Sequence, residues 1–301
     1  MHKTGLSRLL PVFCRCCEDN QPMTHPLISG HTRLYAIVGD PITQVQTPQA
    51  INHLLAERGV DGVLVPLQVA DEDFAVFIAS LRRLKNFGGM VVTVPHKTAM
   101  AALCDSISPA AAAVGAVNVV RREADGRLVG EILDGQGFVA GLRQHGIGVH
   151  GQSAYLAGAG GAAHAIAFAL ADAGLASLTI YNRSPAKVQA LAARLAAHCP
   201  AMTVQAGSAD PVGHPLVINA TSLGMQAGDA LPFSTDTLTA DQTVAEIIMQ
   251  PALTPLLAAA QARGCRIHYG APMLACQVAL MADFMGIPTS HTALNNPESA
   301  A

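Results

Sequence analysis

The chain has 301 residues, of which 50% are hydrophobic and only 13% are charged, with a formal net charge of −3. This length predicts two domains with ample core, and the composition excludes a disordered chain. A slightly acidic chain gives no electrostatic case for nucleic acid or a membrane surface, and we expect neither as a partner.

The N-terminal segment lacks clear structural signals. Seven cysteines without a regular framework predict reduced thiols and a cytoplasmic protein. Cys14, Cys16 and Cys17 form a cluster. No His or Cys follows at the spacing of a zinc finger, so we expect no metal site. The apolar patch over 9–13 is shorter than a signal-peptide core, and no uncharged apolar run reaches membrane-spanning length. We interpret residues 1–30 as a flexible extension.

The first half of the chain alternates strand and helix patterns. A helix is predicted to open at Thr47-Pro48, with Thr47 as its N-cap, and to stop before Gly59. Asp125-Gly126 marks the turn of a hairpin. We expect strands over 34–39, 62–67, 89–94, 117–122 and 127–131, and helices over 47–58, 71–85, 97–104 and 135–145. This alternation predicts a separate α/β domain.

A glycine-rich turn after a buried strand indicates a dinucleotide site. The strand ends at Leu156, and Gly158-x-Gly160-x-x-Ala163 follows. Gly158 permits the tight turn, Gly160 lets the backbone approach a pyrophosphate, and Ala163 allows close helix–strand packing. The helix over 162–173 would direct its unpaired N–H groups at the phosphates.

The end of the next strand, 178–181, selects the cofactor. An NAD site carries an acidic residue about 20 residues beyond the fingerprint. Here the sequence is Tyr181-Asn182-Arg183-Ser184, without Asp or Glu. Arg183 can pair with a 2′-phosphate and Ser184 can donate a further bond, which predicts NADP. The alternative is a tightly packed Ala-rich helix with Arg183 on a solvated turn.

Three elements are predicted after this unit. Residues 246–249 are interpreted as the last strand of the dinucleotide-binding domain. A helix is expected from Thr254 to Arg263, stopped at Gly264. Residues 272–286 predict an apolar helix that folds back onto the first domain.

Several segments, in this order, resemble the shikimate dehydrogenase family. They are Gly39-Asp40-Pro41-Ile42 with Thr47-Pro48, Thr93-Val94-Pro95-His96-Lys97, Gly115-Ala116-Val117-Asn118, Asp134-Gly135-x-Gly137-Phe138, Gly158 to Ala163, Asn182-Arg183-Ser184, Ile218 to Met225, and Gly270 to Leu274 with Gln277. The resemblance implies an α/β protein of two domains. A substrate-binding domain with a mixed sheet would span 31–133 plus 271–301, and a Rossmann NADP-binding domain would span 134–270.

The resemblance implies reversible hydride transfer between NADP and a ring secondary alcohol, from shikimate to 3-dehydroshikimate or a close analogue. Such a step needs a group that takes the hydroxyl proton as hydride leaves. Lys97 would take that proton, and Asp134 would bond both Lys97 and a substrate hydroxyl. Without the resemblance, Lys97 reads as a surface lysine after a proline turn and Asp134 as a helix cap.

The resemblance also assigns contacts to substrate and cofactor. Thr93, Asn118 and Gln277 fall where the family holds ring hydroxyls, and a missing hydroxyl would leave such residues unpaired. The cofactor residues it implies are Gly158, Ala159, Gly160, Gly161, Ala162, Asn182, Arg183, Ser184, Lys187, Ala220, Thr221, Gly270 and Met273.

The substrate pocket departs from the family pattern. The two serines that the family offers to the substrate carboxylate are replaced by Val45 and Thr47, on either side of Gln46. The expected Asn is Val91 and the expected Tyr is Met249. Each lost polar contact would cost about 1–3 kcal/mol if the facing group stays polar. We therefore expect the chemistry and cofactor site to be kept and substrate recognition to be changed.

Three interpretations stay open at this stage. The first is a shikimate dehydrogenase with a rearranged carboxylate contact that uses Gln46. The second is a divergent relative that oxidises quinate, another cyclic polyol or a hydroxy acid. The third is a non-catalytic NADP-binding sensor, favoured if Lys97 lies far from the nicotinamide. We expect a monomer or homodimer.

Overall fold

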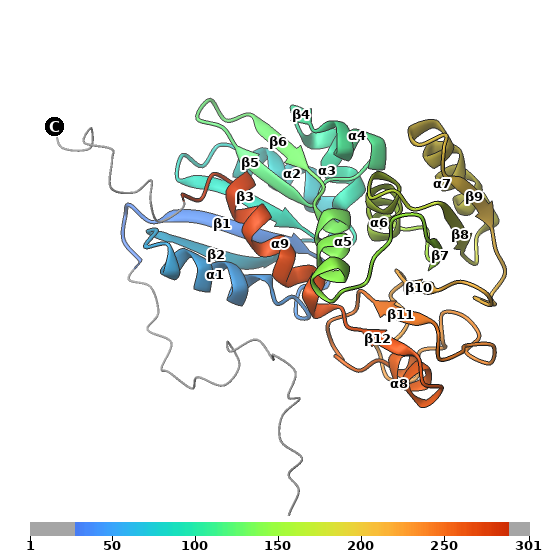
Figure 1. The fold of residues 1–301 in the computed structure, drawn as a ribbon. Coiled ribbons are helices and arrows are strands. Elements are labelled where there is room, and N and C mark those ends of the chain that lie inside the picture. The colour runs from blue at the N-terminus through green and yellow to red at the C-terminus, as the bar shows by residue number, and fades with distance from the viewer. Residues whose placement is uncertain (1–27, 289–301) are drawn as a thin grey trace, which may run out of the picture.

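The computed structural model describes residues 28–288, which form two six-stranded sheets side by side with helices packed on them (Figure 1). The cysteine cluster and nearly all of the extension predicted over 1–30 lie outside the described residues. The α/β class with one mixed and one parallel sheet is confirmed. No helix in the described part of the chain is long and apolar enough to cross a membrane.

The first sheet is mixed. In spatial order its strands are β2 (Gly62–Gln68), β1 (Arg33–Gly39), β3 (Phe87–Val92), β5 (Val119–Arg122), β6 (Leu128–Glu131) and β4 (Ser106–Ile107). β1 is parallel to β2 and β3, whereas β5 is antiparallel to β3 and β6. The helices of this region are α1 (Thr47–Glu57), α2 (Asp71–Leu81), α3 (Lys97–Leu103) and α4 (Pro109–Val114).

The second sheet is entirely parallel. Its strands are, in spatial order, β12 (Arg266–His268), β11 (Thr243–Glu246), β10 (Leu216–Asn219), β7 (Ser153–Ala157), β8 (Ser177–Tyr181) and β9 (Thr203–Ala206). Its helices are α6 (Gly161–Asp172), α7 (Pro185–His198) and α8 (Pro255–Ala262). The strand order reverses at β7 and β10, and ligands bind in the crevice that such a reversal opens at the carboxyl ends of the strands.

Two helices carry the chain between the sheets, α5 (Asp134–Gln144) and α9 (Ala271–Phe284), and they pack against each other (Figure 1). Close approach requires glycine on α5, because a Cβ at Gly137 would lie 2.2 Å from Cγ of Gln277. α9 then completes the core of the first sheet. A single buried cluster joins its end to β1 and α1, and includes Tyr35, Ile37, Ile51, Leu55, Met281, Ala282, Met285 and Ile287. Burial of each Ile, Leu or Met side chain in this cluster contributes about 1.5–3 kcal/mol.

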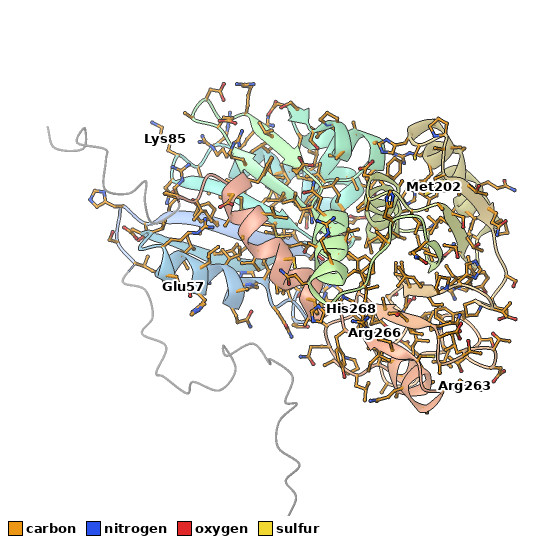
Figure 2. The ribbon with its side chains drawn as sticks, in the orientation of Figure 1. Glu57, Lys85, Met202, Arg263, Arg266 and His268 are labelled. Carbon is orange, nitrogen blue, oxygen red and sulfur yellow. The ribbon has the colours of Figure 1, made fainter. Side chains whose placement is uncertain are left out.

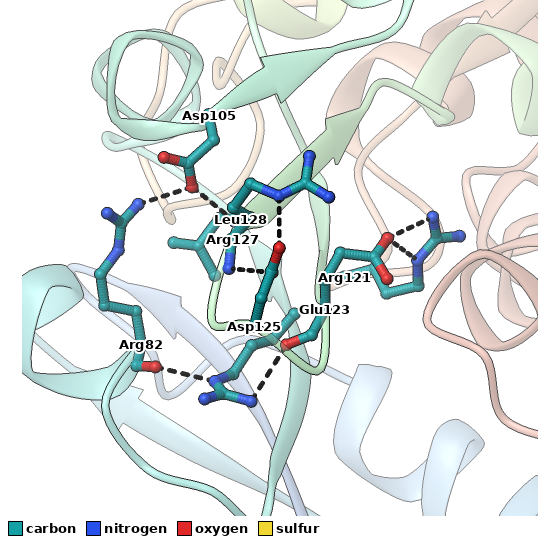
Figure 3. A network of polar contacts seen from close by, with 8 residues as sticks. Arg82, Asp105, Arg121, Glu123, Asp125, Arg127 and Leu128 are labelled. Atoms are coloured by element: carbon teal, nitrogen blue, oxygen red, sulfur yellow. Dashed lines mark hydrogen bonds and ion pairs between the residues drawn. The ribbon is translucent and has the colours of Figure 1, made fainter.

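Polar contacts hold the β5–β6 hairpin, whose predicted turn at Asp125-Gly126 is confirmed (Figure 3). Arg127 bonds Asp125 at 2.7 Å across the turn. Arg122 donates to the carbonyl of Arg82 at 2.8 Å, which ties β5 to the end of α2. The effect of these contacts is to fix the hairpin against its neighbours.

Several predicted boundaries are wrong, and the structure explains three of them. The helix over 71–85 ends at Leu81, because the amides of Arg83 and Leu84 bond only three residues back and the chain turns into β3. The helix at Thr47 has Gln46 as its N-cap, whose backbone is already helical at φ −110° and ψ −6°, so Thr47 is the first helical residue.

The strand predicted over 246–249 ends at Glu246, and β12 follows as a further strand, so 246–249 is not the last one. The carboxylate of Glu246 accepts the amides of Ile247 and Ile248 at 3.1 and 3.4 Å, which turns these groups away from the sheet.

Candidate active site

Three polar side chains converge on the carboxylate of Asp134. Nζ of Lys97 donates to Oδ2 at 2.5 Å. Nδ2 of Asn118 and Nε2 of Gln277 donate to Oδ1 at 2.9 and 3.1 Å. The side chains of Lys97 and Asp134 are 15% and 6% exposed. The four residues come from α3, α5, α9 and the segment before β5, so the fold brings together four parts of the chain.

Local structure explains where these side chains lie. Lys97 is the first residue of α3, after the turn that follows β3. Asp134 is the first residue of α5, where a negative charge is favourable because of the helix dipole. Oδ1 of Asn118 accepts the amide of Leu133 at 2.8 Å, so Asn118 fixes both Asp134 and the backbone that precedes it.

The Lys97–Asp134 pair lies beside the glycine fingerprint. A Cβ placed on Gly161, the first residue of α6, would be 3.9 Å from Cβ and Cδ of Lys97. The pair is therefore at the junction of the two sheets, next to the turn that is expected to bind the pyrophosphate.

The fingerprint turn has the geometry that a dinucleotide requires. Gly158 has φ +122°, and a Cβ there would lie 2.7 Å from the carbonyl oxygen of Ala220. Gly160 is the exposed N-cap of α6, with nothing within 4 Å of an added Cβ, so the backbone is open to a ligand. Ala163 is fully buried against the strand. These residues fit the phosphates of a bound dinucleotide.

A cavity of about 320 Å³ opens at the carboxyl end of β8. It contains Asn182 and Arg183, the residues from which NADP was predicted. Tyr181, the last residue of β8, also lines it. The remaining lining was missed by the sequence reasoning, because it comes from α7 and the end of β9 and carries no motif: Pro185, Val188, Gln189, Ala206 and Gly207. Arg183 is exposed at its rim, where a guanidinium suits a phosphate.

The other predicted cofactor residues come from several elements around the fingerprint turn. Ser184 is the N-cap of α7 and Lys187 is exposed in its first turn. Thr221 donates to Oδ1 of Asn219 at 2.7 Å, next to the fingerprint. Gly270 packs against the backbone of Ile248, since a Cβ there would lie 2.3 Å from its carbonyl oxygen. Ala159, Ala162 and Met273 belong to the fingerprint turn, α6 and α9.

The predicted substrate residues show an apolar surface beside Asp134. Val91 is 4% exposed, in a hydrophobic cluster that also contains Leu133. Val45 packs against the same cluster. Thr47 is buried at the start of α1, while Gln46, Thr93 and Met249 are half-buried. The hydrophobic cluster therefore extends to Leu133, the residue directly before Asp134.

His96 does not join Lys97. Its imidazole is fully buried and bonds the carbonyl of Val69 at 2.7 Å and Asp71 at 3.1 Å. The ring stacks on Phe74 with centroids 4.0 Å apart. It fixes the segment before Lys97 to the loop between β2 and α2.

A second cavity, of about 210 Å³, lies at the amino ends of β7, β10, β11 and β12. Its lining includes Gln152, Leu216, Asp241 and Arg266 but none of the predicted site residues. It is at the opposite edge of the sheet from the fingerprint.

The chain is similar to known proteins over most of its length. The family model for the shikimate dehydrogenase substrate binding domain matches residues 37–120, and that for shikimate / quinate 5-dehydrogenase matches residues 142–212. The shikimate dehydrogenase (NADP(+)) of Acidiphilium cryptum is 41% identical over 249 residues, which are 82% of this chain and 88% of that protein.

Two solved structures are similar over most of the chain. Shikimate 5-dehydrogenase from Thermus thermophilus, in complex with NADP(H) and shikimate, has a TM-score of 0.77 and 31% identity, covering 86% of this chain and 95% of that one. The ligand-free 5-ketofructose reductase of a Gluconobacter strain has a TM-score of 0.76 and 31% identity, covering 87% and 95%.

Proposed function

The chain belongs to the shikimate dehydrogenase family, and on that premise we propose that it transfers hydride reversibly between NADP and a ring hydroxyl of shikimate, giving 3-dehydroshikimate. The observation that supports this most directly is the Lys97–Asp134 pair beside Gly161. A sensor without catalysis would not need a buried lysine and carboxylate at that place.

The bonds around Asp134 suggest how the proton moves. Oδ1 accepts Asn118 and Gln277, while Oδ2 accepts Lys97, so the carboxylate keeps Lys97 in one position. In oxidation, the substrate O–H bond breaks and its proton passes to Nζ of neutral Lys97. The C–H bond breaks with its electron pair, and NADP, when bound, supplies the acceptor for that hydride. In reduction, the Lys97 ammonium returns the proton.

The remaining assignments are proposals of the same kind. Thr93, Asn118 and Gln277 hold ring hydroxyls, and Thr47 with Gln46 meets the carboxylate in place of the family's serines. Residues 31–133 with 271–301, of which 289–301 lie outside the described residues, are assigned to the substrate-binding unit, and 134–270 to the cofactor unit. The enzyme acts in the cytoplasm as a monomer or homodimer.

Cofactor choice rests on the end of β8. The cavity there presents Arg183 without an acidic partner among its lining residues, which favours a 2′-phosphate over a free ribose hydroxyl. The NADP named for the curated relatives agrees with this choice.

A second candidate substrate is a neutral polyol or ketose. Val45 packs against the hydrophobic cluster that contains Val91, where the family offers polar contacts, and one similar structure is named a 5-ketofructose reductase. Recognition of a carboxylate would then be weak.

A substrate comparison tests both candidates. Purified protein is given NADP with shikimate or quinate, and NADPH with 3-dehydroshikimate or 5-ketofructose, and NADPH absorbance is followed. We expect the highest kcat/KM with shikimate and 3-dehydroshikimate. Higher kcat/KM with 5-ketofructose would favour the neutral substrate, and no turnover with any of the four would contradict both.

A further inference from the structure

Glu246 is a buried carboxyl group that the proposed reaction does not use. It lies at the carboxyl end of β11 and is 0% exposed. Nδ2 of Asn219 donates to its two oxygens at 3.0 and 3.1 Å, and the Thr254 hydroxyl donates at 3.1 Å. The amides of Ile247 and Ile248 complete the set at 3.1 and 3.4 Å.

These bonds join two loops. Asn219 also accepts the amide and hydroxyl of Thr221 at 3.0 and 2.7 Å, and donates to the carbonyl of Leu223 at 3.1 Å. Glu246 thereby fixes the loop after β10 through Asn219, and the loop after β11 through its own following amides. The Thr254 hydroxyl also accepts the amide of Leu257, so the start of α8 belongs to the same network.

Both loops border the fingerprint crevice. The Ala220 carbonyl lies against Gly158, and the Ile248 carbonyl lies against Gly270, each close enough to exclude a Cβ. In a doubly wound sheet each half binds one mononucleotide. β7, β8 and β9 carry the cavity with Arg183, so β10 and β11 border the nicotinamide half.

We propose that Glu246 is a positioning residue that fixes the two loops around the nicotinamide half of NADP, so that cofactor affinity depends on its carboxylate. This rests on the proposed function only in taking NADP as the cofactor. Glu246 itself touches neither substrate nor cofactor.

The charge state of Glu246 gives the proposal a measurable property. Burial, only partly offset by its hydrogen bonds, raises the pKa of Glu246 to about 7. The groups of β10, β11 and α8 that act on this pKa are all neutral in the described chain: Asn219, Thr254 and the amides of Ile247 and Ile248. The carboxylate accepts hydrogen bonds from all four of these donor groups, whereas a protonated carboxyl group accepts fewer. NADP affinity should therefore fall as pH falls through this pKa.

The test measures NADPH binding to wild type and Glu246→Gln by the fluorescence of the nicotinamide, without substrate. The pH runs from about one unit below to about one unit above the pKa of Glu246. In the variant the carboxamide turns an N–H donor toward other donors. At pH values above that pKa we therefore expect the Kd for NADPH to rise about tenfold. The dependence of Kd on the ionisation of Glu246 should vanish, while the titration of the 2′-phosphate remains in both proteins.

Controls separate positioning from general damage. Glu131→Gln changes a carboxylate of the first sheet that accepts the amide of Ile132 at 2.8 Å, and its NADPH Kd should stay within about twofold of wild type. Glu246→Asp keeps the charge and should restore part of the affinity and the pH dependence. A folded Glu246→Gln protein with wild-type Kd and pH profile would overturn the proposal.

Thr254→Val provides a second route if Glu246→Gln does not fold. It removes one donor to the carboxylate, which should raise the pKa of Glu246 and move the midpoint of NADPH binding to higher pH. An unchanged midpoint would overturn the proposal. Shikimate turnover by wild type is recorded separately, so failure of the proposed substrate leaves this result interpretable.

Discussion

Gln277 on α9 donates to Oδ1 of Asp134 at 3.1 Å, across 143 residues of sequence. The bond connects the two helices that cross between the sheets, at the carboxylate that also holds Lys97. The position of α9 is therefore tied to the geometry of the candidate site.

Replacing Gly137 by Ala tests that tie. Its Cβ would lie 2.2 Å from Cγ of Gln277 and 2.9 Å from the carbonyl of Met273, so α9 must shift. We expect kcat to fall at least about tenfold and the free energy of unfolding to fall by about 1–3 kcal/mol. Steady-state kinetics and urea unfolding measure both. Gly148→Ala, which has open space around the new Cβ, is the matched control. Wild-type kcat in Gly137→Ala would contradict the expectation.

Lys97→Ala should remove turnover and leave the cofactor bound. Loss of the proton acceptor is expected to lower kcat by about 10²- to 10⁴-fold, while the Kd for NADPH stays close to wild type. Lys85→Ala is the control, because Lys85 is exposed at the far side of the first sheet, away from the junction (Figure 2). Turnover retained by Lys97→Ala would exclude Lys97 as the base.

Arg183→Ala should weaken NADP far more than NAD. A charge-assisted bond to phosphate contributes about 1.5–3 kcal/mol, so KM for NADP should rise about 10- to 100-fold. KM for NAD, which has no 2′-phosphate, should change little. Arg127→Ala, in the hairpin of Figure 3, controls for loss of one arginine. An equal rise in KM for NADP and for NAD would show that Arg183 does not recognise the 2′-phosphate.

His268 should make stability depend on pH. Burial, with the charges of His145 and Arg266, lowers its pKa from 6.5 to about 4. Nε2 has no hydrogen-bond partner among the described residues, and Figure 2 places the side chain where the two halves of the molecule meet. Between about pH 4 and 6.5, His268 is protonated in the unfolded chain but neutral in the folded protein. The free energy of unfolding therefore rises as pH rises from about 4 to 6.5.

His268→Phe should remove that rise in the free energy of unfolding. The rise amounts to about 3 kcal/mol, because each unit of pKa shift corresponds to about 1.4 kcal/mol. Glu246 acts oppositely, because its raised pKa makes stability fall as pH rises from 4.5 to about 7. The difference between variant and wild type in urea unfolding isolates His268. His53→Gln, an exposed histidine paired with Glu57, should show no such difference. A profile parallel to wild type in His268→Phe would show that His268 is not the source.

Val45→Ser tests the apolar surface of the substrate pocket. A serine there would restore a donor to a substrate carboxylate, and one bond to a charged group contributes about 1.5–3 kcal/mol. We expect kcat/KM for shikimate to rise about tenfold or more, with little change for 5-ketofructose. A gain for both substrates, or for neither, would show that Val45 does not select for the carboxylate.

Local patterns were sufficient for most of the fold. The Asp125-Gly126 hairpin and the Gly158 turn need backbone conformations that few residue types adopt. Both were predicted from the sequence and are confirmed. Lys97, Asp134 and Gln277 could be grouped only through the family resemblance, because no spacing predicts contacts over 37 and 143 residues. Their roles in substrate and cofactor binding stay predictions.

Two strands near the end of the parallel sheet were not predicted correctly, for local reasons. The strand over 246–249 was predicted from apolar residues, but Glu246 bonds the amides that would have continued it. β12 was missed because three residues carry no pattern. Asn219 and Glu246 are polar residues at the carboxyl ends of two buried strands. Polar residues at such positions could have predicted the hydrogen-bond network between the two loops.

The contribution of α9 to the first core also bears on the order of events during synthesis. β1 and α1 are made before the second sheet, yet Met281, Met285 and Ile287, which close their hydrophobic cluster, are made after it. The parallel sheet and its helices are complete before then, and domains fold as units during translation. The nucleotide-binding half should thus fold first, because the core of the first sheet is complete only after α9 has emerged from the ribosome.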